Sequence, residues 1–218
     1  MKLDKNSKLV MIGDSITDVG RAQPAGEGLF DALGRGYVSL VDALLGAAYP
    51  DHGVRVVNMG TSGNTVRDLE ARWESDVLDK KPDWLSVMIG ANDVWRQFDS
   101  PRQTESHVLL GEYEQTLDRL LVRTLPAVGN VVLMTPFYIE PNRADAMRAR
   151  IDEYGAAVRR LSVRHGTLFV DTQAAFDTVL TSYYPATLAW DRVHPNQTGH
   201  MVIARAFLEA VEFEWHHG

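Results

Sequence analysis

The sequence predicts an α/β protein in which helices cover both faces of an open, five-stranded parallel sheet. Five short apolar runs rich in β-branched residues alternate along the 218-residue chain with segments of helical spacing. Most of the runs are continuously apolar rather than alternating, which is typical of strands buried on both faces. Strands that alternate with helices in this way favour a parallel sheet. We therefore expect one α/β domain that spans residues 1–218.

The expected elements follow one another without a linker, a repeat or a low-complexity segment. The expected strands are Lys8–Ile12, Val54–Asn58, Trp84–Ile89, Val131–Thr135 and Leu168–Val170. Apolar residues recur at intervals of three and four in the expected helices, around residues 37–48, 66–77, 113–125, 147–161 and 197–211. The last of these helices is apolar on most sides, which predicts that it is well buried. The glycine-rich segment 20–36 is expected to be an irregular surface loop rather than a domain boundary.

Composition excludes several classes of function. The formal net charge is −7, and this sign repels phosphate groups, so we expect no nucleic-acid or membrane partner. The chain has no cysteine, which excludes disulfides, a thiol nucleophile and thiolate metal ligands. The first eight residues are polar, and no apolar segment approaches the roughly 18–20 residues of a membrane span. We therefore expect a cytoplasmic protein, and give no weight to the closing His216 and His217.

Four polar segments punctuated by glycine or proline follow the expected strands. They are residues 13–18 (GDSITD), 58–65 (NMGTSGNT), 90–93 (GAND) and 190–195 (WDRVHP). In a parallel α/β sheet, ligand sites form at the carboxyl ends of the strands, because loops from separate strands converge there. We therefore expect all four segments to lie on one rim of the sheet.

The residues on this rim fit one reaction, nucleophilic acyl transfer. Ser15 directly follows a strand and a short turn, a position from which a hydroxyl can project above the sheet edge. A serine hydroxyl is a weak nucleophile and needs a neighbouring base. His194 can be this base, because an imidazole takes and returns a proton near neutrality. Asp191, three residues earlier, can hold the ring tautomer and stabilise the imidazolium, which completes a triad.

Attack on a carbonyl creates an oxyanion, which needs hydrogen-bond donors already in place. We expect these donors to be the backbone N–H groups of Ser15 and Gly63 and the side-chain amide of Asn92. Gly63 suits the close approach of backbone to a ligand, because it has no β-carbon.

Each of these residues also has a purely structural explanation. Taken alone, Ser15 could cap a helix, since serine is favoured there, and Gly63 could be a turn residue. Asn92 and the aspartate after it resemble a turn pair, and His194 could be structural. The catalytic interpretation is favoured, because it explains all four segments in order on the same rim.

In these four segments the sequence resembles the SGNH, or GDSL-like, hydrolase family. Ser15, Gly63, Asn92 and His194 are the four residues whose letters name the family, and the segments extend over residues 13–195. All four in order are far more specific than the Gly-Asp-Ser tripeptide alone. The resemblance implies a flavodoxin-like three-layer α/β/α sandwich. It also implies ester hydrolysis through an acyl-enzyme, with no metal and no cofactor.

A narrower resemblance is to the bacterial acetylxylan esterases of this family. The stretches that carry it are residues 56–58, 62–69, 92–97, 135–140 and 188–195. These enzymes remove acetyl groups from xylose units, and the intracellular type acts on short xylo-oligosaccharides. The resemblance therefore implies a small acetylated saccharide as substrate and a homo-oligomeric state.

Aromatic residues near the expected rim give softer support for a sugar ester. Trp95, Tyr184 and Trp190, with Tyr138, could stack on pyranose faces or enclose a small acetyl pocket. Each could equally be a core or interface aromatic. Trp190 is the strongest candidate because it adjoins Asp191, although it could also pack the triad loop in place.

Three other functions remain open at this point. The triad could serve another acyl substrate, as in a lysophospholipase, a thioesterase or an arylesterase. Asp191, His194 and His200 could instead bind a metal ion, but a histidine six residues further on, inside a helix, is expected to point away from His194. The chain could also be a non-catalytic carbohydrate-binding protein, although four intact segments argue against this.

Overall fold

The computed structural model describes residues 1–215, and within this part of the chain five parallel strands form one sheet. The strands are β1 (Lys8–Gly13), β2 (Arg55–Gly60), β3 (Trp84–Met88), β4 (Asn130–Met134) and β5 (Leu168–Val170). Their order across the sheet is β2-β1-β3-β4-β5, so the predicted flavodoxin-like fold is confirmed. The chain adds β2 on one side of β1 and β3, β4 and β5 on the other, so the topological switch point lies between β1 and β3. Ligand sites form at this point in open α/β sheets. His216 and His217 lie outside the described residues.

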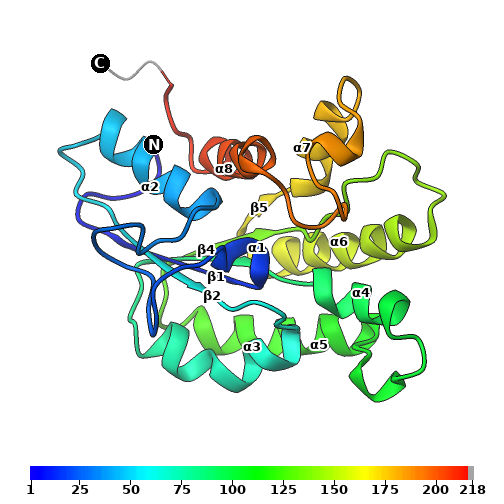
Figure 1. The fold of residues 1–218 in the computed structure, drawn as a ribbon. Coiled ribbons are helices and arrows are strands. Elements are labelled where there is room, and N and C mark those ends of the chain that lie inside the picture. Colours follow the sequence, from blue (N-terminus) through cyan, green and yellow to red (C-terminus); the bar gives the residue numbers. More distant parts are fainter. Residues whose placement is uncertain (216–218) are drawn as a thin grey trace.

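Helices cover both faces of the sheet (Figure 1). They are α1 (Ser15–Asp18), α2 (Tyr37–Ala48), α3 (Val66–Trp73), α4 (Ala91–Asp99), α5 (Leu110–Thr124), α6 (Ala146–His165), α7 (Thr172–Val179) and α8 (Gln197–Ala210). Helices α2, α7 and α8 pack together on one face, and α3, α5 and α6 pack side by side on the other. The buried apolar side chains of all layers belong to one cluster around the sheet.

The α-helix at residues 66–77 is shorter than its apolar stripe predicts. Regular α-helix ends at Trp73, and a π-helical turn, Glu74–Leu78, follows it. Val77 is fully buried in this turn. The apolar spacing thus predicts the burial of Val77 correctly, although the backbone changes to a wider helix.

Polar side chains explain where two of the helices begin. Asp145 precedes α6, and its carboxylate accepts hydrogen bonds from the backbone N–H groups of Met147 and Arg148, both at 3.0 Å. Asn196 precedes α8 and accepts from the N–H of Gly199 at 3.2 Å. Such caps satisfy N–H groups that have no partner inside a helix.

The glycine-rich loop 20–36 covers the outer edge of β2. Gly26 and Asn58 form an antiparallel bridge with backbone hydrogen bonds of 2.9 and 2.8 Å. The buried Asn58 amide also donates to the carbonyls of Thr17 and Leu33, at 2.7 and 2.8 Å. The loop thus occupies an edge that would otherwise be free to pair with another strand, and Asn58 ties it to α1.

Helix α1 lies directly on the carboxyl ends of β1 and β2. Gly60, the last residue of β2, allows this approach, because a β-carbon there would lie 2.6 Å from the carbonyl carbon of Thr17 and 2.7 Å from the Cα of Asp18. Contacts of a β-carbon that short do not occur in proteins, so only glycine fits. No layer of side chains separates this part of α1 from the sheet.

Candidate active site

Ser15 is the first residue of α1, and its neighbour Asp14, not Ser15 itself, caps the helix. The Asp14 carboxylate accepts a hydrogen bond from the backbone N–H of Ile16 at 3.0 Å. Burial raises the pKa of Asp14 to about 6, although the Ile16 hydrogen bond and the nearby His194 act in the opposite direction. Because the cap is supplied by Asp14, the hydroxyl of Ser15 is free to face the rim of the sheet.

Ser15, His194 and Asp191 form a continuous hydrogen-bonded array. Ser15 Oγ lies 2.8 Å from His194 Nε2, and His194 Nδ1 lies 2.5 Å from Asp191 Oδ2. Asp191 Oδ1 accepts the backbone N–H groups of Val193 and His194, at 3.0 and 2.8 Å. With a proton on Nδ1 directed at the carboxylate, Nε2 can accept the hydroxyl proton of Ser15.

The electrostatics of Asp191 suit this array. Burial alone would raise the pKa of Asp191, but the hydrogen bonds from the His194 ring and from the N–H groups of His194 and Val193 hold that pKa below its usual value. The carboxylate therefore stays charged near neutral pH, the state that stabilises an imidazolium. The side chains of Asp191 and His194 are 36% and 44% exposed, so the array is open to solvent.

The backbone between Asp191 and His194 is held in an unusual conformation. Arg192 has a φ of 63°, in the left-handed region. Such a conformation costs a non-glycine residue on the order of 1–3 kcal/mol and persists only where the surroundings hold it. Here the Arg192 carbonyl accepts the N–H of Ile139 at 2.8 Å, and Nη1 of Arg192 contacts Glu140 Oε2 at 2.6 Å. The loop after β4 therefore holds the loop that carries Asp191 and His194.

The three expected oxyanion donors come from neighbouring segments. Among residues 1–215, the backbone N–H groups of Ser15 and Gly63 take part in no hydrogen bond within the chain. Gly63 has a φ of 82°, which favours glycine. Asn92 Nδ2 donates to the Asn64 carbonyl at 3.0 Å, which leaves the second amide hydrogen available.

The segments that carry these donors are tied together. Asp18, at the end of α1, accepts hydrogen bonds from the backbone N–H and the hydroxyl of Ser62, at 3.1 and 2.7 Å. The N–H of Thr61 donates to the Gly13 carbonyl at 3.0 Å. The loop that carries Gly63 is therefore fastened to the helix and the strand on either side of the candidate nucleophile.

Asn92 and Asp93 lie in the first turn of helix α4, so they do not form the turn pair considered from the sequence. Asp93 Oδ1 accepts the backbone N–H of Val66 at 3.0 Å, which links the first turn of α4 to the start of α3. Complete burial raises the pKa of Asp93 to about 7, against the opposing effect of the Val66 hydrogen bond. In the described part of the chain, Asp93 Oδ2 is buried with no hydrogen-bond partner.

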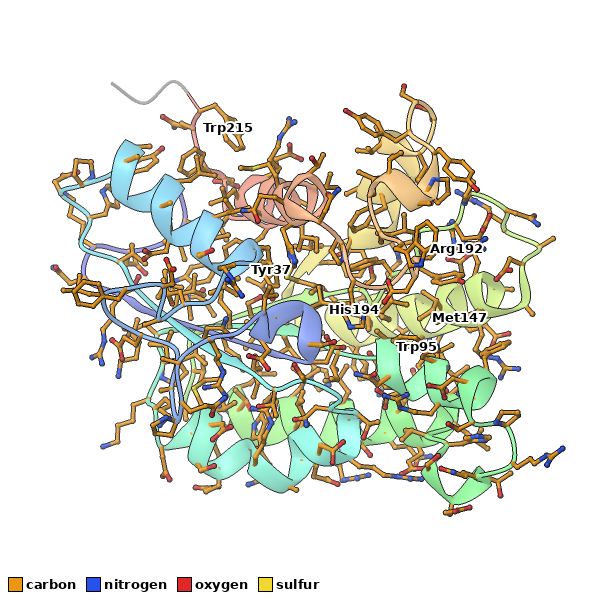
Figure 2. The ribbon with its side chains drawn as sticks, viewed as in Figure 1. Tyr37, Trp95, Met147, Arg192, His194 and Trp215 are labelled. Atoms are coloured by element: carbon orange, nitrogen blue, oxygen red, sulfur yellow. The ribbon has the colours of Figure 1, made fainter. Side chains whose placement is uncertain are left out.

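The aromatic candidates lie in different surroundings. The half-buried Trp95 packs against His194, with ring centroids 5.7 Å apart (Figure 2). Trp190 is 91% exposed and Tyr184 is 73% exposed, so neither is a core residue. The exposure of Trp190 also argues against a role in packing the triad loop. Tyr138 is half-buried.

His200 does not face a shared metal site with the triad. Its ring is buried, and Nδ1 accepts the backbone N–H of Tyr37 at 3.2 Å. Burial lowers the pKa of His200 to about 4, with a smaller contribution from His194. Within residues 1–215, no group of three histidine or acidic side chains is arranged to hold a metal ion.

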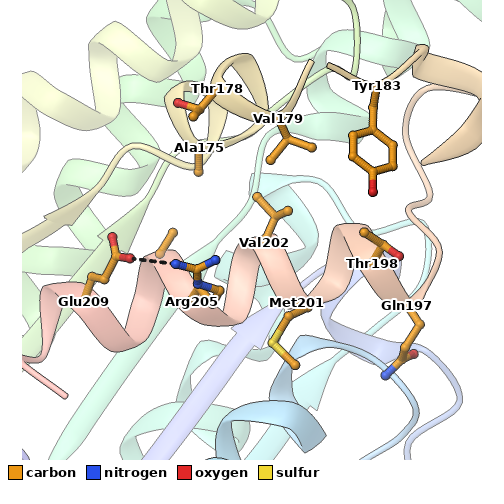
Figure 3. Close-up of a pocket in the computed structure, with 11 residues that line it drawn as sticks. Ala175, Thr178, Val179, Tyr183, Gln197, Thr198, Met201, Val202, Arg205 and Glu209 are labelled. Atoms are coloured by element: carbon orange, nitrogen blue, oxygen red, sulfur yellow. Dashed lines mark ion pairs between the residues drawn. The ribbon is translucent and has the colours of Figure 1, made fainter. Parts of the chain in front are cut away.

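A groove of about 630 Å³ lies between α7 and α8 (Figure 3). Its lining includes the apolar side chains of Val179, Met201 and Val202, and an ion pair of 3.9 Å joins Arg205 to Glu209. None of the triad or oxyanion candidates lines this groove. In the part of the chain that the structure describes, no helix is both long and apolar enough to cross a membrane.

The fold, together with a hydrogen-bonded Ser-His-Asp array at the switch point of the sheet, is that of a serine hydrolase of the SGNH type. The chain belongs to the GDSL-like lipase/acylhydrolase family, which it matches over residues 11–202. The resemblance seen in the sequence is thereby confirmed.

Close relatives have been characterised structurally. The chain is 60% identical over 215 residues to the acetylxylan esterase of Geobacillus stearothermophilus, covering 99% of this chain and 98% of the relative. The crystal structure of Axe2, an acetylxylan esterase from that organism, matches with a TM-score of 0.98 at 60% identity, over 99% of this chain and 98% of Axe2. LAE5, an alpha/beta hydrolase enzyme from the metagenome of Lake Arreo, Spain, matches with a TM-score of 0.96 at 58% identity, over 98% of each chain. Solved structures of Axe2 also include the catalytic mutants S15A, D191A and H194A.

Proposed function

We propose that the protein is a serine esterase that removes acetyl groups from acetylated xylo-oligosaccharides. The observation that carries the proposal is the 2.8 Å contact between Ser15 Oγ and His194 Nε2, with Asp191 on the other ring nitrogen. The 60% identity to an acetylxylan esterase supports the choice of substrate. The Axe2 catalytic mutants, which carry the same residue numbers, support the choice of triad.

In this mechanism His194, oriented by Asp191, takes the proton of Ser15 as its oxygen attacks the acetyl carbonyl carbon. The oxyanion that forms accepts hydrogen bonds from the N–H groups of Ser15 and Gly63 and from the Asn92 amide. The protonated His194 then gives its proton to the sugar oxygen, the ester C–O bond breaks, and the deacetylated sugar leaves. Water, activated by His194, attacks the acetyl-enzyme, which releases acetate and restores Ser15.

Exposed aromatic side chains beside the triad support a saccharide substrate. Trp190 directly precedes Asp191, and Tyr184 lies a few residues before it; both are largely exposed. Sugar rings have apolar C–H faces that pack on exposed aromatic rings. We assign Trp190 and Tyr184 to sugar binding. Trp95, which packs on His194, is assigned to the wall of the acetyl pocket.

Two further parts of the proposal rest on the resemblance to the intracellular acetylxylan esterases. We propose a homo-oligomeric state, which sedimentation velocity of the purified full chain tests. We also propose a cytoplasmic location, which fractionation of the host cells tests. A monomer over the whole concentration range would contradict the homo-oligomeric state. Recovery of the protein outside the cytoplasm would contradict the proposed location.

The test of the proposed function is a panel of substrates with a Ser15→Ala variant as the control. The panel contains acetylated xylobiose, acetylated glucosides, a cephalosporin acetate, phenyl acetate, an acyl thioester and a lysophospholipid. We expect the highest kcat/KM on acetylated xylobiose and no release above background by Ser15→Ala. A preference for the lysophospholipid, the thioester or the phenyl ester would assign the triad to that substrate instead. Binding of acetylated xylobiose without turnover would indicate a carbohydrate-binding protein.

A further inference from the structure

We propose that Arg72 and Asn64 form a positioning pair that holds the oxyanion hole in its working geometry. The inference rests on the proposed function, because it concerns the donors Gly63 and Asn92 of that reaction. Neither Arg72 nor Asn64 touches the reacting atoms in the mechanism above. Their role is to act through the two donors.

The loop that carries Gly63 needs support from outside. Residues 61–65 join β2 to α3 without regular structure, and Ser62 and Gly63 are exposed. A β-carbon on Gly63 would meet no atom within 4 Å, so packing around Gly63 does not set the direction of its N–H. Donors stabilise an oxyanion effectively only when they are held in place before the reaction. Hydrogen bonds to the neighbouring residues must therefore hold the Gly63 peptide.

Asn64 is held at its side chain and at its backbone. Its Oδ1 accepts a hydrogen bond from Arg72 Nε at 2.7 Å, and its carbonyl accepts one from Asn92 Nδ2 at 3.0 Å. Asn64 is covalently joined to Gly63, so the same residue connects two of the three oxyanion donors. Arg96 Nη2 lies 3.4 Å from Asn92 Oδ1, which fits the amide orientation in which Nδ2 donates one hydrogen to the Asn64 carbonyl.

Arg72 fastens Asn64 to the sheet. Its side chain is only 16% exposed. Nη1 donates to the Met59 carbonyl at 2.7 Å and Nη2 to the Gly13 carbonyl at 2.9 Å. Nη1 also pairs with Asp76, one helical turn along, at 2.7 Å. A single guanidinium thus joins the end of β1, just before the candidate nucleophile, to the end of β2, just before the oxyanion loop.

The planar guanidinium is what makes this arrangement possible. Its donors lie in a rigid fork and reach several acceptors in different directions at once. A lysine ammonium at position 72 would keep the positive charge but could not reproduce all of these contacts. Arg72→Lys therefore separates the geometry of the side chain from its charge.

A purely structural role would have a different signature. Loss of a structural contact lowers the stability of the fold but leaves the turnover of the folded enzyme unchanged. Loss of a positioning contact lowers kcat, because the donors are no longer aimed at the oxyanion, and leaves KM nearly unchanged.

The experiment measures kcat and KM on acetylated xylobiose for the wild type, Asn64→Ala, Arg72→Lys and the double variant. Arg67→Ala is the matched control: Arg67 lies on the same helix but pairs with Glu112 on the protein surface. We expect each single variant to lower kcat on the order of 10-fold, since small displacements of positioned groups have effects of this size or larger. The double variant should be no slower than Arg72→Lys alone, because both changes break the same bond. The control should keep the kcat of the wild type.

A second readout does not depend on the natural substrate. Diethyl 4-nitrophenyl phosphate reacts with an activated serine and places its phosphoryl oxygen in the oxyanion hole. Its inactivation rate constant should fall on the order of 10-fold in Asn64→Ala, in parallel with kcat. If the wild type did not deacetylate xylobiose, the proposed function would fail, and this reagent would still test the positioning pair. A folded Asn64→Ala variant with a wild-type inactivation rate would overturn the inference.

Discussion

The indole ring of Trp95 lies against the imidazole of His194, with centroids 5.7 Å apart and the ring planes tilted by 55°. The Arg96 guanidinium also lies close to this indole, 5.6 Å from its centre. The indole thus contacts both a charged group and the ring that faces Ser15. The contact with His194 limits how far the imidazole can turn out of line with the serine hydroxyl.

Replacing Trp95 tests this contact. Trp95→Ala should lower kcat on acetylated xylobiose on the order of 10-fold, because the imidazole gains freedom to leave its productive orientation. Trp95→Phe keeps an aromatic surface and should recover most of the loss. Equal turnover in the wild type and the alanine variant would show that Trp95 does not orient His194.

Replacing different members of the triad should leave different residual activities. Ser15→Ala should lower turnover by about 10⁴–10⁶-fold, because the nucleophile is lost. Asp191→Ala should retain more activity, because the carboxylate orients and stabilises the imidazole and makes no bond to the substrate. Single-turnover and steady-state kinetics of the two purified variants provide the comparison. Retention of more than a tenth of wild-type turnover by Ser15→Ala would refute the assignment.

Asn92 should matter for the transition state rather than for binding. Asn92→Ala should lower kcat by about 10²–10³-fold, the usual effect of losing one oxyanion donor, and should change KM little. Steady-state kinetics over a full range of acetylated xylobiose concentrations separate the two constants. An effect on KM alone would count against the oxyanion role.

Asp93 should make the stability of the fold depend on pH. Burial raises its pKa to about 7, so the folded state binds this proton more tightly than the unfolded chain does. The stabilising contribution of the protonated carboxyl is complete below about pH 4 and is lost as the pH rises towards about 7. The amide introduced by Asp93→Asn cannot ionise but keeps an oxygen for the Val66 N–H. The difference in Tm between variant and wild type should therefore grow in favour of the variant from about pH 5 to about pH 7. A difference in Tm that stays constant over this range would contradict the role of Asp93.

Trp190 should affect sugars more than simple esters. Trp190→Ala should raise KM on acetylated xylobiose several-fold and leave the kinetics on ethyl acetate nearly unchanged, because only the sugar offers a ring face to the indole. Equal effects on both substrates would mean that the indole supports the neighbouring triad loop instead. Sedimentation velocity of the variant checks that its assembly state is that of the wild type.

The sequence predicts the sheet well because its strands are buried on both faces and read as continuous apolar runs. The bounds differ most at the carboxyl end of β2, where Met59 and Gly60 look like part of a polar loop but pair with β1. Short helices escape prediction for a related reason. Residues 90–93 have the composition of a turn, but Gly90 caps α4 and Ala91, Asn92 and Asp93 form its first turn. The prediction of one domain over residues 1–218 stays a prediction, supported by the apolar cluster that joins the layers within residues 1–215.

The candidate catalytic residues could be proposed from the sequence, because few residue types perform acyl transfer and the four segments that carry them occur in a specific order. The residues that position these catalytic groups could not be predicted from the sequence. Arg72 lies on an amphipathic helix rich in charged residues, where an arginine usually faces solvent, and nothing in its spacing indicates its contacts with Asn64 and the two strand ends. Asp18 and Asn64 likewise resemble ordinary loop and turn residues. Their roles depend on distances between segments that are far apart along the chain.

Because α1 packs directly on the strand ends, the protein should respond differently to substitutions at this contact and to substitutions elsewhere in the core. Gly60 lies directly beneath Thr17 and Asp18, so at this contact main-chain atoms set the distance between the helix and the sheet. Volume changes among the core side chains can then be absorbed by the outer helices without lifting the nucleophile. A methyl group at position 60 would have the opposite effect, because it would push Ser15 away from its base while leaving the rest of the interior intact.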